Sequence, residues 1–250
     1  MSRNVQLLPV TVPDDAGLLI TSPRRYNLLT LLIFGRRRSR LLAELALSSG
    51  AGPGDRVLDI GCGPGKLAQV LGAAVGPGGA VLGVDPSAAM VDYARAHTRE
   101  PNCRFDIATA QSLPAGDAEF DIVTCTFVMH HIAPHGREEA LAQMWRVLRP
   151  GGLLLLADAD VQHSGVMRVL AALVGRRKRH GHTRPDAHGH GAQPDPASVV
   201  DVRRYSDLLR AVGFEAPDFT ASRYSTGILT ARKPVPTPAG GGAVQAGAAQ

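Results

Sequence analysis

The sequence has few cysteines, few aromatic residues and no long apolar run. Its 250 residues include three cysteines, at positions 62, 103 and 125, without any CxxC spacing. We therefore expect neither a disulfide framework nor a metal site, and a reducing cytoplasm is the natural compartment. The longest apolar runs, at residues 28–34 and 153–157, are too short to span a bilayer. No segment near the N-terminus combines the features of a signal peptide, so we expect a soluble, cytoplasmic protein.

Lysine is also scarce, and arginine supplies most of the positive charge. Lysines occur only at positions 66, 178 and 233, while the formal net charge is +5 and the pI is about 9.5. The arginine, alanine and glycine bias is typical of high-GC coding, so the basic pI is weak evidence for nucleic acid. The basic clusters at 36–40 and 176–179 contain no interleaved aromatics of the kind that bind single strands. We expect no specific nucleic-acid partner and at most peripheral contact with anionic lipid.

The strongest ligand-binding signal is the stretch Val-Leu-Asp-Ile-Gly-Cys-Gly-Pro-Gly at residues 57–65. It predicts a short buried strand, a glycine turn and a helix that begins at Lys66. Glycine permits positive φ and close approach of a ligand to free N–H groups at the helix start. The dinucleotide fingerprint fails because Lys66 stands where its third glycine belongs, and the P-loop fails at Ile60 and Leu67. A tight strand–helix turn without a ligand is the alternative.

A second acidic residue is predicted to end the next strand. Residues 80–84 form an apolar run that leads directly into Asp85, and a helix follows through Met90. An acidic residue in that place can accept hydrogen bonds from both hydroxyls of a ribose. The alternative is a turn residue at the start of the helix, for which Ser87 is the better N-cap.

The rest of the chain continues the alternation of strands and helices. Two helices are expected within residues 24–47, ahead of the first strand, where they could cover a ligand cleft. Further strands are expected at 104–107, 120–125, 153–157 and 224–231, and further helices at 138–148 and 205–212. A short helix is also conceivable at 166–174, and the segment 149–152 is expected to be a turn that stops a helix.

Four segments together resemble the class I S-adenosylmethionine-dependent methyltransferases of the type 11 group. They are the glycine stretch at 57–65, Ala-Thr-Ala-Gln-Ser-Leu-Pro at 108–114, Phe-Asp-Ile-Val with Met-His-His-Ile at 120–132, and Val-Leu-Arg-Pro-Gly-Gly at 147–152. The resemblance spans about residues 54–158. It implies an α/β, Rossmann-like, doubly wound sheet of seven strands, mostly parallel with one antiparallel strand near the C-terminus and helices on both faces. It also implies an enzyme that binds S-adenosylmethionine and methylates a small molecule.

The resemblance assigns cofactor contacts to particular positions. Asp59 and the glycine loop would hold the methionine part, Asp85 the ribose, and the backbone of Ala110 the adenine. Thr109 stands at the family's aspartate position and could accept a hydrogen bond only without charge, which predicts weaker binding of the cofactor. The implied cofactor-binding set is Asp59, Gly61, Cys62, Gly63, Gly65, Asp85, Pro86, Thr109, Ala110 and Cys125.

The acceptor side is less defined. A hydroxyl or phenol acceptor must lose a proton, and a histidine suits that role near pH 7. His130 is the first candidate and His131 the second, with Tyr26 as a partner, although one histidine of the pair could simply cap a turn. Residues 26–37 look like the N-terminal helix of ubiquinone/menaquinone biosynthesis methyltransferases, which suits an apolar quinone precursor at a membrane surface. That family carries Arg-Asn where this chain has His130-His131, so the acceptor stays open.

Two other readings concern the whole chain. A nicotinamide dehydrogenase is disfavoured by Lys66, and a base methyltransferase would carry Asn/Asp-Pro-Pro-Tyr where residues 124–127 read Thr-Cys-Thr-Phe. A non-enzymatic basic binding protein on the same fold is the remaining alternative.

The predicted organisation is an N-terminal helical cover (1–50), a methyltransferase domain (51–233) and a disordered tail (234–250). Within the domain, 175–197 is expected to be a flexible, histidine-rich insert, and metal binding by its two His-x-His pairs is the alternative. The oligomeric state is not indicated.

Overall fold

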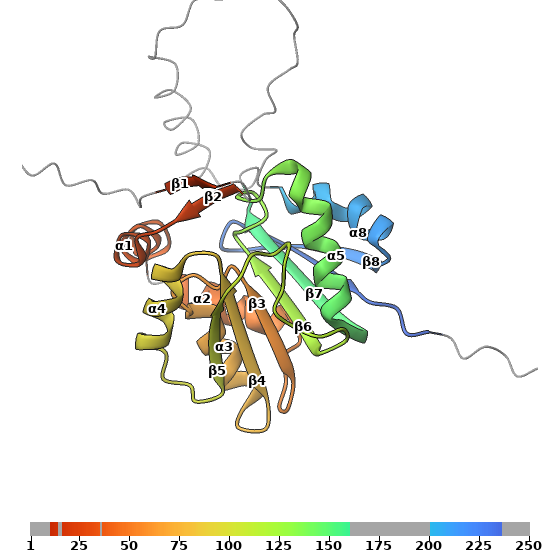
Figure 1. The fold of residues 1–250 in the computed structure, drawn as a ribbon, viewed down its shortest axis with the longest axis horizontal. Helices are drawn as coiled ribbons and strands as arrows, with labels where there is room; N and C mark the ends of the chain where they lie inside the picture. Colours follow the sequence, from red (N-terminus) through yellow and green to blue (C-terminus); the bar gives the residue numbers. More distant parts are fainter. Residues whose placement is uncertain (1–10, 15–16, 36, 161–200, 237–250) are drawn as a thin grey trace, which may run out of the picture.

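The computed structural model describes residues 11–14, 17–35, 37–160 and 201–236, and its centre is a sheet of seven strands. The strands lie in the order β5-β4-β3-β6-β7-β9-β8 (Figure 1). They are β3 (Arg56–Ile60), β4 (Ala80–Asp85), β5 (Cys103–Ile107), β6 (Phe120–Thr126), β7 (Leu148–Ala159), β8 (Glu215–Ser222) and β9 (Thr226–Arg232). Strand β9 runs antiparallel to both β7 and β8, whereas the other neighbouring strands of this sheet pair in parallel, which confirms the predicted sheet.

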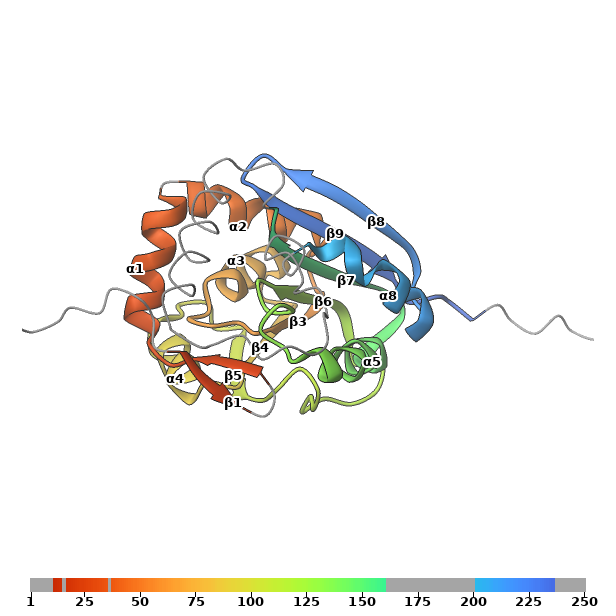
Figure 2. The ribbon, with the colours of Figure 1, turned by 90° about the horizontal axis from the view of Figure 1, so that it is seen from above.

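Helices cover both faces of this sheet, as predicted. The described helices are α1 (Pro23–Phe34), α2 (Arg37–Ser48), α3 (Lys66–Val75), α4 (Ala88–His97), α5 (Arg137–Val147) and α8 (Ser206–Val212), with 3₁₀ turns η1 (Pro134–Gly136) and η3 (Val202–Tyr205). One core cluster joins α2, α3 and α4 to one face, and a second joins α5 and α8 to the other. Figure 2 shows α2 and α3 on one side and α5 and α8 on the opposite side.

Burial on both faces explains the sequence of the central strands. The run from Leu154 to Ala157 in β7 is buried at every position, because alternate side chains enter the two clusters. Helix α3 instead has a single buried stripe that includes Leu67, Leu71 and Val75, one position every four residues. This spacing is expected when only one side of a helix packs on a sheet.

The N-terminal region contains the two expected helices and one unexpected pair of strands. The break between α1 and α2 falls at Gly35, whose φ is +52°. Strands β1 (Thr11–Asp14) and β2 (Gly17–Ile20) form a separate two-stranded antiparallel sheet. Four-residue strands are too short for periodicity to reveal, so the sequence predicted only a helical cover here. Helix α2 is tied to the far edge of the sheet, because Ser222 Oγ donates a 2.6 Å hydrogen bond to Glu44 Oε2.

Three further differences from the sequence-based expectation have local causes. Residues 149–152 belong to β7 and are not a turn, because backbone bonds between Lys233 and both Gly151 and Gly152 (2.8 and 3.0 Å) hold them in the ladder. Tyr205 lies in η3 and not in the following helix. Strand β8 is a mostly exposed edge strand that contains a proline, so its sequence lacks the usual strand pattern.

Several predictions fall on residues outside the described ranges. These are the conceivable helix at 166–174, the insert at 175–197 and most of the tail at 234–250. Among the described residues, no helix is both long and apolar enough to cross a membrane.

Candidate cofactor and acceptor site

The parallel strands bring most of the candidate residues to one edge of the sheet. The glycine loop follows β3, Asp85 ends β4, and Thr109 and Ala110 lie just after β5. His130 and His131 follow β6. Parallel strands end at a common carboxyl edge, where open α/β sheets bind their ligands. The structure therefore brings together residues that are as far as 70 positions apart in the sequence.

The glycine loop has the backbone geometry that its sequence predicts. Gly61, Gly63 and Gly65 have φ values of +66°, +52° and +74°, a region that residues with a Cβ seldom adopt. Gly65 also permits close packing, since a Cβ there would lie 3.0 Å from the Phe105 ring and 3.1 Å from Ala94 Cβ. At Gly63 only a ring carbon of Tyr26 would lie near an added Cβ, at 4.0 Å. The loop is therefore open at Gly63.

Asp59 lies beneath this loop, almost fully buried, in the middle of the sheet. Its Oδ1 accepts a 2.8 Å hydrogen bond from Thr124 Oγ1, because the two residues are in register on β3 and β6. Its Oδ2 is buried and has no hydrogen-bond partner among the described residues. Burial raises the pKa of Asp59 to about 7, the Thr124 bond opposes that shift, and the charge of Asp85 adds to it. An unpaired buried carboxylate oxygen is a site for a donor or a cation.

Asp85 joins the glycine loop to the start of α4. Its Oδ2 accepts the Gly63 N–H at 3.0 Å and its Oδ1 accepts the Ser87 N–H at 2.9 Å. Burial raises the pKa of Asp85, and these two backbone bonds oppose the shift by favouring the carboxylate. Each carboxylate oxygen can accept more than one hydrogen bond, so the geometry leaves acceptor capacity for hydroxyl groups.

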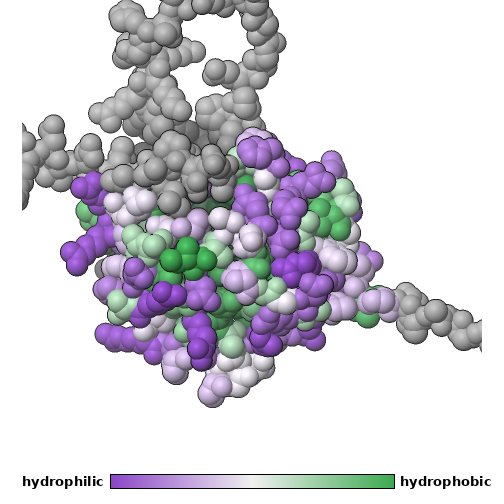
Figure 3. Space-filling model, in the orientation of Figure 1, coloured by the Kyte–Doolittle hydropathy of each residue, from purple (hydrophilic) through white to green (hydrophobic). Residues whose placement is uncertain are grey.

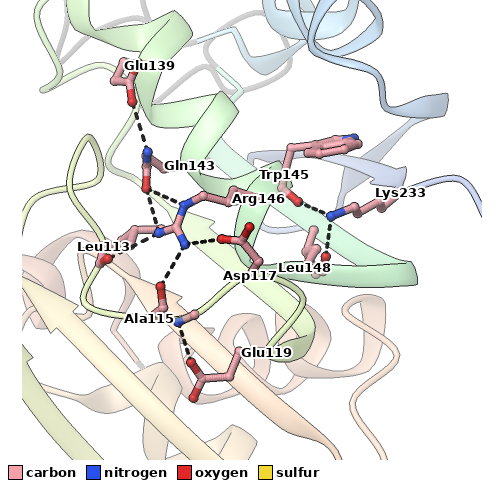
Figure 4. A network of polar contacts seen from close by, with 11 residues as sticks. Leu113, Ala115, Asp117, Glu119, Glu139, Gln143, Trp145, Arg146, Leu148 and Lys233 are labelled. Carbon is pink, nitrogen blue, oxygen red and sulfur yellow. Dashed lines mark hydrogen bonds and ion pairs between the residues drawn. The ribbon is translucent and has the colours of Figure 1, made fainter.

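The segment after β5 is held in place from the opposite side of the sheet. Arg146 on α5 donates to the carbonyl oxygens of Ala115 and Leu113 at 2.8 and 3.4 Å, and to Asp117 Oδ1 at 2.8 Å (Figure 4). Ala110, a few residues upstream, is buried in the core cluster, and Thr109 is partly exposed. The Arg146 guanidinium thus links the later part of this segment to α5.

The exit from β6 is unusual. Phe127 has a φ of +59°, which is uncommon for a residue with a large side chain, and its N–H donates to the Ala157 oxygen at 2.7 Å. The following residue, Val128, packs against Gly61. A Cβ added at Gly61 would overlap Val128 Cγ2 and lie 3.1 Å from Val128 Cγ1. The kink therefore seats the segment after β6 directly on the glycine loop.

This kink aims His130 at a carboxylate that ends β7. His130 Nδ1 lies 2.6 Å from Asp158 Oδ2, and the Asp158 side chain is only 2% exposed. Asp158 Oδ1 accepts the Ala159 N–H at 2.8 Å, which fixes the carboxylate plane. A carboxylate accepts hydrogen bonds, so Nδ1 is the donor in this contact, and in the neutral imidazole Nε2 keeps its lone pair. This contact leaves Nε2 as the ring nitrogen that could accept a proton.

His131 has a different environment, although its ring centroid is only 4.0 Å from that of His130. Its Nδ1 is buried without a hydrogen-bond partner among the described residues. Burial, together with the charge of His130, lowers the pKa of His131 to about 3. A group with so low a pKa is a poor base near neutral pH, so His130 is the better candidate of the two.

Tyr26 reaches the site from the covering helix α1. Its ring approaches the open position of the glycine loop at Gly63. Burial raises the pKa of the Tyr26 phenol, the charge of Arg38 opposes the shift, and the charges of Asp85, Asp158 and Asp59 add to it. A single side chain therefore lies within electrostatic reach of all three site carboxylates.

Three residues of the expected cofactor set contribute no polar side chain to the site edge. Cys62 and Cys125 are buried in the two core clusters, and burial raises the pKa of both thiols. Pro86 is exposed next to Asp85. These residues could contact a ligand through their backbone or by shape alone.

Asp158 is the residue that the sequence reasoning missed. A signal was present: the apolar run at 153–157 ends in an acidic residue, as the first strand of the sheet ends near Asp59 and the second in Asp85. A carboxylate at the end of a buried parallel strand marks the ligand edge. The pairing with His130, 28 positions away, appears only when β6 and β7 are adjacent.

The order of strands and a ligand site at the β3 and β4 ends define a class I, Rossmann-like methyltransferase fold. A family model described as "Methyltransferase domain" matches residues 57–152. A SAM-dependent methyltransferase from Aquifex aeolicus has the same fold, with a TM-score of 0.61, 19% identity, and coverage of 85% of this chain and 98% of that one.

Two proteins of similar sequence show which methyltransferases this chain resembles. The demethylmenaquinone methyltransferase of Deinococcus radiodurans is 37% identical over 202 residues, 76% of this chain and 80% of that protein. The ubiquinone/menaquinone biosynthesis C-methyltransferase of Stutzerimonas stutzeri is 38% identical over 141 residues, 54% of this chain and 53% of that protein. The chain thus spans about half the length of the Stutzerimonas relative. It belongs to the class I S-adenosylmethionine-dependent methyltransferases, which are enzymes that use S-adenosylmethionine as methyl donor.

The residues at the carboxyl edge fit that cofactor on two observations. The unpaired Asp59 Oδ2 is a buried acceptor next to the loop, where the positive charge of an amino-acid moiety would be stabilised. The open position at Gly63 lets a ligand approach the backbone of the loop.

Proposed function

We propose that this protein transfers the methyl group of S-adenosylmethionine to a hydroxyl oxygen of a small, apolar or aromatic acceptor. The observation that carries this proposal is the 2.6 Å contact between His130 Nδ1 and Asp158 Oδ2 beside the glycine loop. Binding the methyl donor requires no base, whereas a neutral hydroxyl acceptor must lose its proton as it is methylated. In this proposal His130, oriented by Asp158, would be that base at the edge of the sheet where the donor would bind.

The cofactor half of the proposal rests on three groups of residues. Asp59 and the backbone of Gly61, Cys62, Gly63 and Gly65 would hold the methionine part, and Asp85, next to Pro86, the ribose. Thr109 and the backbone of Ala110 would contact the adenine, and Cys125 would lie behind the methyl group at the end of β6. The bound cofactor supplies an electrophilic methyl group on a sulfonium, so the protein needs mainly to align a nucleophile with it.

His130 would act as the general base. With Nδ1–H directed at Asp158, Nε2 would take the proton of the acceptor hydroxyl. The acceptor oxygen would displace the sulfur from the methyl carbon, and the sulfur would leave with the electron pair of the broken bond. The buried carboxylate stabilises the imidazolium that results and keeps the ring in the correct tautomer. His131 stays neutral and would serve as a wall of the acceptor pocket, while Tyr26 closes the pocket from α1.

A second candidate is methylation of a quinone-precursor carbon. The identity to a protein named demethylmenaquinone methyltransferase over 80% of its length favours it. The presence of His130-His131 in place of Arg-Asn after β6 favours oxygen, because the residues that differ adjoin the acceptor. We also propose that the reaction takes place in the cytoplasm, in keeping with three unpaired cysteines, and that no specific nucleic acid takes part.

The test is methyl transfer from S-adenosylmethionine with a labelled methyl group to a panel of phenols, catechols and reduced naphthoquinones. The carbon or oxygen that carries the label is identified by NMR of the product. Methylation at oxygen is the expected result, whereas methylation only at ring carbon would replace this proposal with the second candidate. No transfer to any member of the panel, with cofactor binding intact, would contradict a small aromatic acceptor.

Variants then test the base. His130→Ala should lower kcat by roughly 10²–10⁴-fold, the usual contribution of a general base. Asp158→Asn should also lower kcat, because the carboxylate that holds Nδ1–H of His130 is lost. The matched control is His97→Ala, an exposed histidine stacked on Tyr93 on α4. Cofactor affinity, measured by calorimetry, should stay unchanged in all three, and unchanged kcat in His130→Ala would exclude it as the base.

A further inference from the structure

Helix α1 exposes an apolar stripe on the side that faces away from the site. Leu28, Leu31 and Leu32 are 45%, 55% and 70% exposed. At about 100° per residue, these leucines lie roughly 140–240° around the helix axis from Tyr26. A single exposed leucine, such as Leu47 on α2, needs no explanation, but three on adjacent turns of one helix form a contiguous surface.

Only positive side chains flank this stripe within the two helices. Arg24 and Arg25 are exposed in the first turn of α1, and Arg37 and Arg40 are exposed at the start of α2, immediately beyond its other end. Helix α1 contains no acidic residue, and the one acid of α2, Glu44, accepts a hydrogen bond from Ser222 on the far side of the sheet. In Figure 3 hydrophilic and apolar side chains lie next to each other along the left margin, where Figure 1 has α1.

We propose that this surface, made of Leu28, Leu31 and Leu32 with the four flanking arginines, docks the protein on an anionic lipid bilayer. Leucines inserted below the headgroups remove apolar area from water, and arginines at both ends of the stripe contact lipid phosphates. Nucleic acid fits the surface less well, because leucines gain nothing from a phosphate backbone and the stripe has no aromatic residue on which bases could stack. Charge complementarity therefore selects lipid.

Docking on a bilayer through α1 would also affect where the acceptor site lies. The same helix carries Tyr26 over the glycine loop on its inner side. A protein that rests on the bilayer through the outer side of α1 would hold its acceptor site close to the membrane surface. An apolar acceptor dissolved in the bilayer could then enter without crossing water. The docking proposal itself does not depend on which acceptor atom is methylated.

The experiment is co-sedimentation of the full chain with sonicated vesicles, either of phosphatidylcholine alone or with a third of phosphatidylglycerol. We expect binding to the anionic vesicles, little binding to the neutral ones, and a loss of binding at high salt. The double variant Leu31→Glu, Leu32→Glu should weaken that binding at least tenfold. Arg24→Glu with Arg25→Glu should weaken it on the order of fivefold per arginine and remove the preference for anionic lipid.

Leu47→Glu is the matched control, because Leu47 is 83% exposed but lies near the other end of α2, roughly 15 Å along that helix from Arg37. Its vesicle binding should equal that of the wild type. Calorimetry with S-adenosylmethionine shows that each variant is folded. Equal binding by the wild type and the Leu31/Leu32 variant, or equal loss in the Leu47 variant, would overturn the proposal. A monomer–dimer equilibrium that only the Leu31/Leu32 change abolishes, without vesicle binding, would assign the surface to a second copy of the chain.

Discussion

The two halves of the site are built in different ways. The cofactor half, at the ends of β3, β4 and β5, consists largely of backbone: three glycines with positive φ and two carboxylates that lie within the strands or at their ends. The acceptor half, at the ends of β6 and β7, consists of side chains brought together from distant positions, with Tyr26 added from a separate helix. Backbone geometry constrains the sequence locally, whereas a side-chain pair can arise wherever two strands are adjacent.

The electrostatics of the halves differ in the same way. Asp59 in the cofactor half has a buried oxygen without a described partner, and its pKa is raised to about 7. Asp158 in the acceptor half is equally buried, but both of its oxygens accept hydrogen bonds, from His130 and from the Ala159 N–H. The Asp59 carboxylate thus keeps one oxygen that a ligand could use, while the Asp158 carboxylate is satisfied within the protein.

The largest expected effect is that of Gly61→Ala. A Cβ there would overlap Val128 and force alanine into a φ of +66°. Overpacking and the unfavourable backbone together should lower the free energy of unfolding by about 2–4 kcal/mol. Thermal unfolding measures it, with Gly50→Ala as the control, since Gly50 has a similar φ of +70° but no atom within 4 Å of an added Cβ. If Gly61→Ala and Gly50→Ala lower the free energy of unfolding equally, the contact of Gly61 with Val128 adds nothing to the cost of the substitution.

The second prediction concerns the pH dependence of Asp59. The carboxyl has a pKa of 3.8 in the unfolded chain and about 7 when folded, so the folded state binds the extra proton between these values. The free energy of unfolding of the ligand-free protein therefore falls as pH rises through this window. Relative to Asp59→Asn, the wild type should lose about 2–3 kcal/mol between pH 5 and pH 8.

Denaturant titrations of both proteins at several pH values test this difference. Asp55→Asn is the control, because Asp55 lies just before β3 and accepts a hydrogen bond from Gly52 N–H at 2.8 Å near the surface. Saturation with S-adenosylmethionine should flatten the wild-type profile if its ammonium pairs with the ionised carboxylate. A pH profile parallel to that of Asp59→Asn would place the Asp59 pKa near its ordinary value.

The different construction of the halves also explains what the sequence could predict. The glycine loop, Asp59 and Asp85 were predictable because the strand, the turn and the helix that fix them are contiguous. The sheet order followed once these segments were assigned to a family. Neither the Phe127 kink nor the His130–Asp158 contact has a local signal, because both depend on β6 lying between β3 and β7. The β1–β2 pair was missed because four-residue strands are too short to show a periodicity, and β8 because most of this edge strand is exposed.

Asp85→Ala should weaken binding of S-adenosylmethionine at least tenfold. The loss of hydrogen bonds to a charged acceptor corresponds to about 1.5–3 kcal/mol. Because Asp85 also accepts bonds from Gly63 and Ser87, Asp85→Asn serves as the second variant, which retains one acceptor oxygen. The control is Asp92→Ala, which removes an exposed carboxylate on α4. Calorimetry that gives equal affinity for Asp85→Ala and Asp92→Ala would remove Asp85 from the ribose contact.

The smallest expected effect tests the weakest member of the cofactor half. Thr109 stands where the family has an aspartate, at the edge of a segment that Arg146 holds to α5. A charged acceptor forms a hydrogen bond that is stronger by about 1 kcal/mol than a neutral one, so Thr109→Asp should tighten cofactor binding about fivefold. Thr109→Val, which keeps the shape but removes the hydroxyl, should weaken it by a similar factor. If neither change alters the affinity measured by calorimetry, the adenine is held by the backbone of this segment alone. The cofactor half would then bind the adenine, as well as the methionine part, mainly through backbone groups.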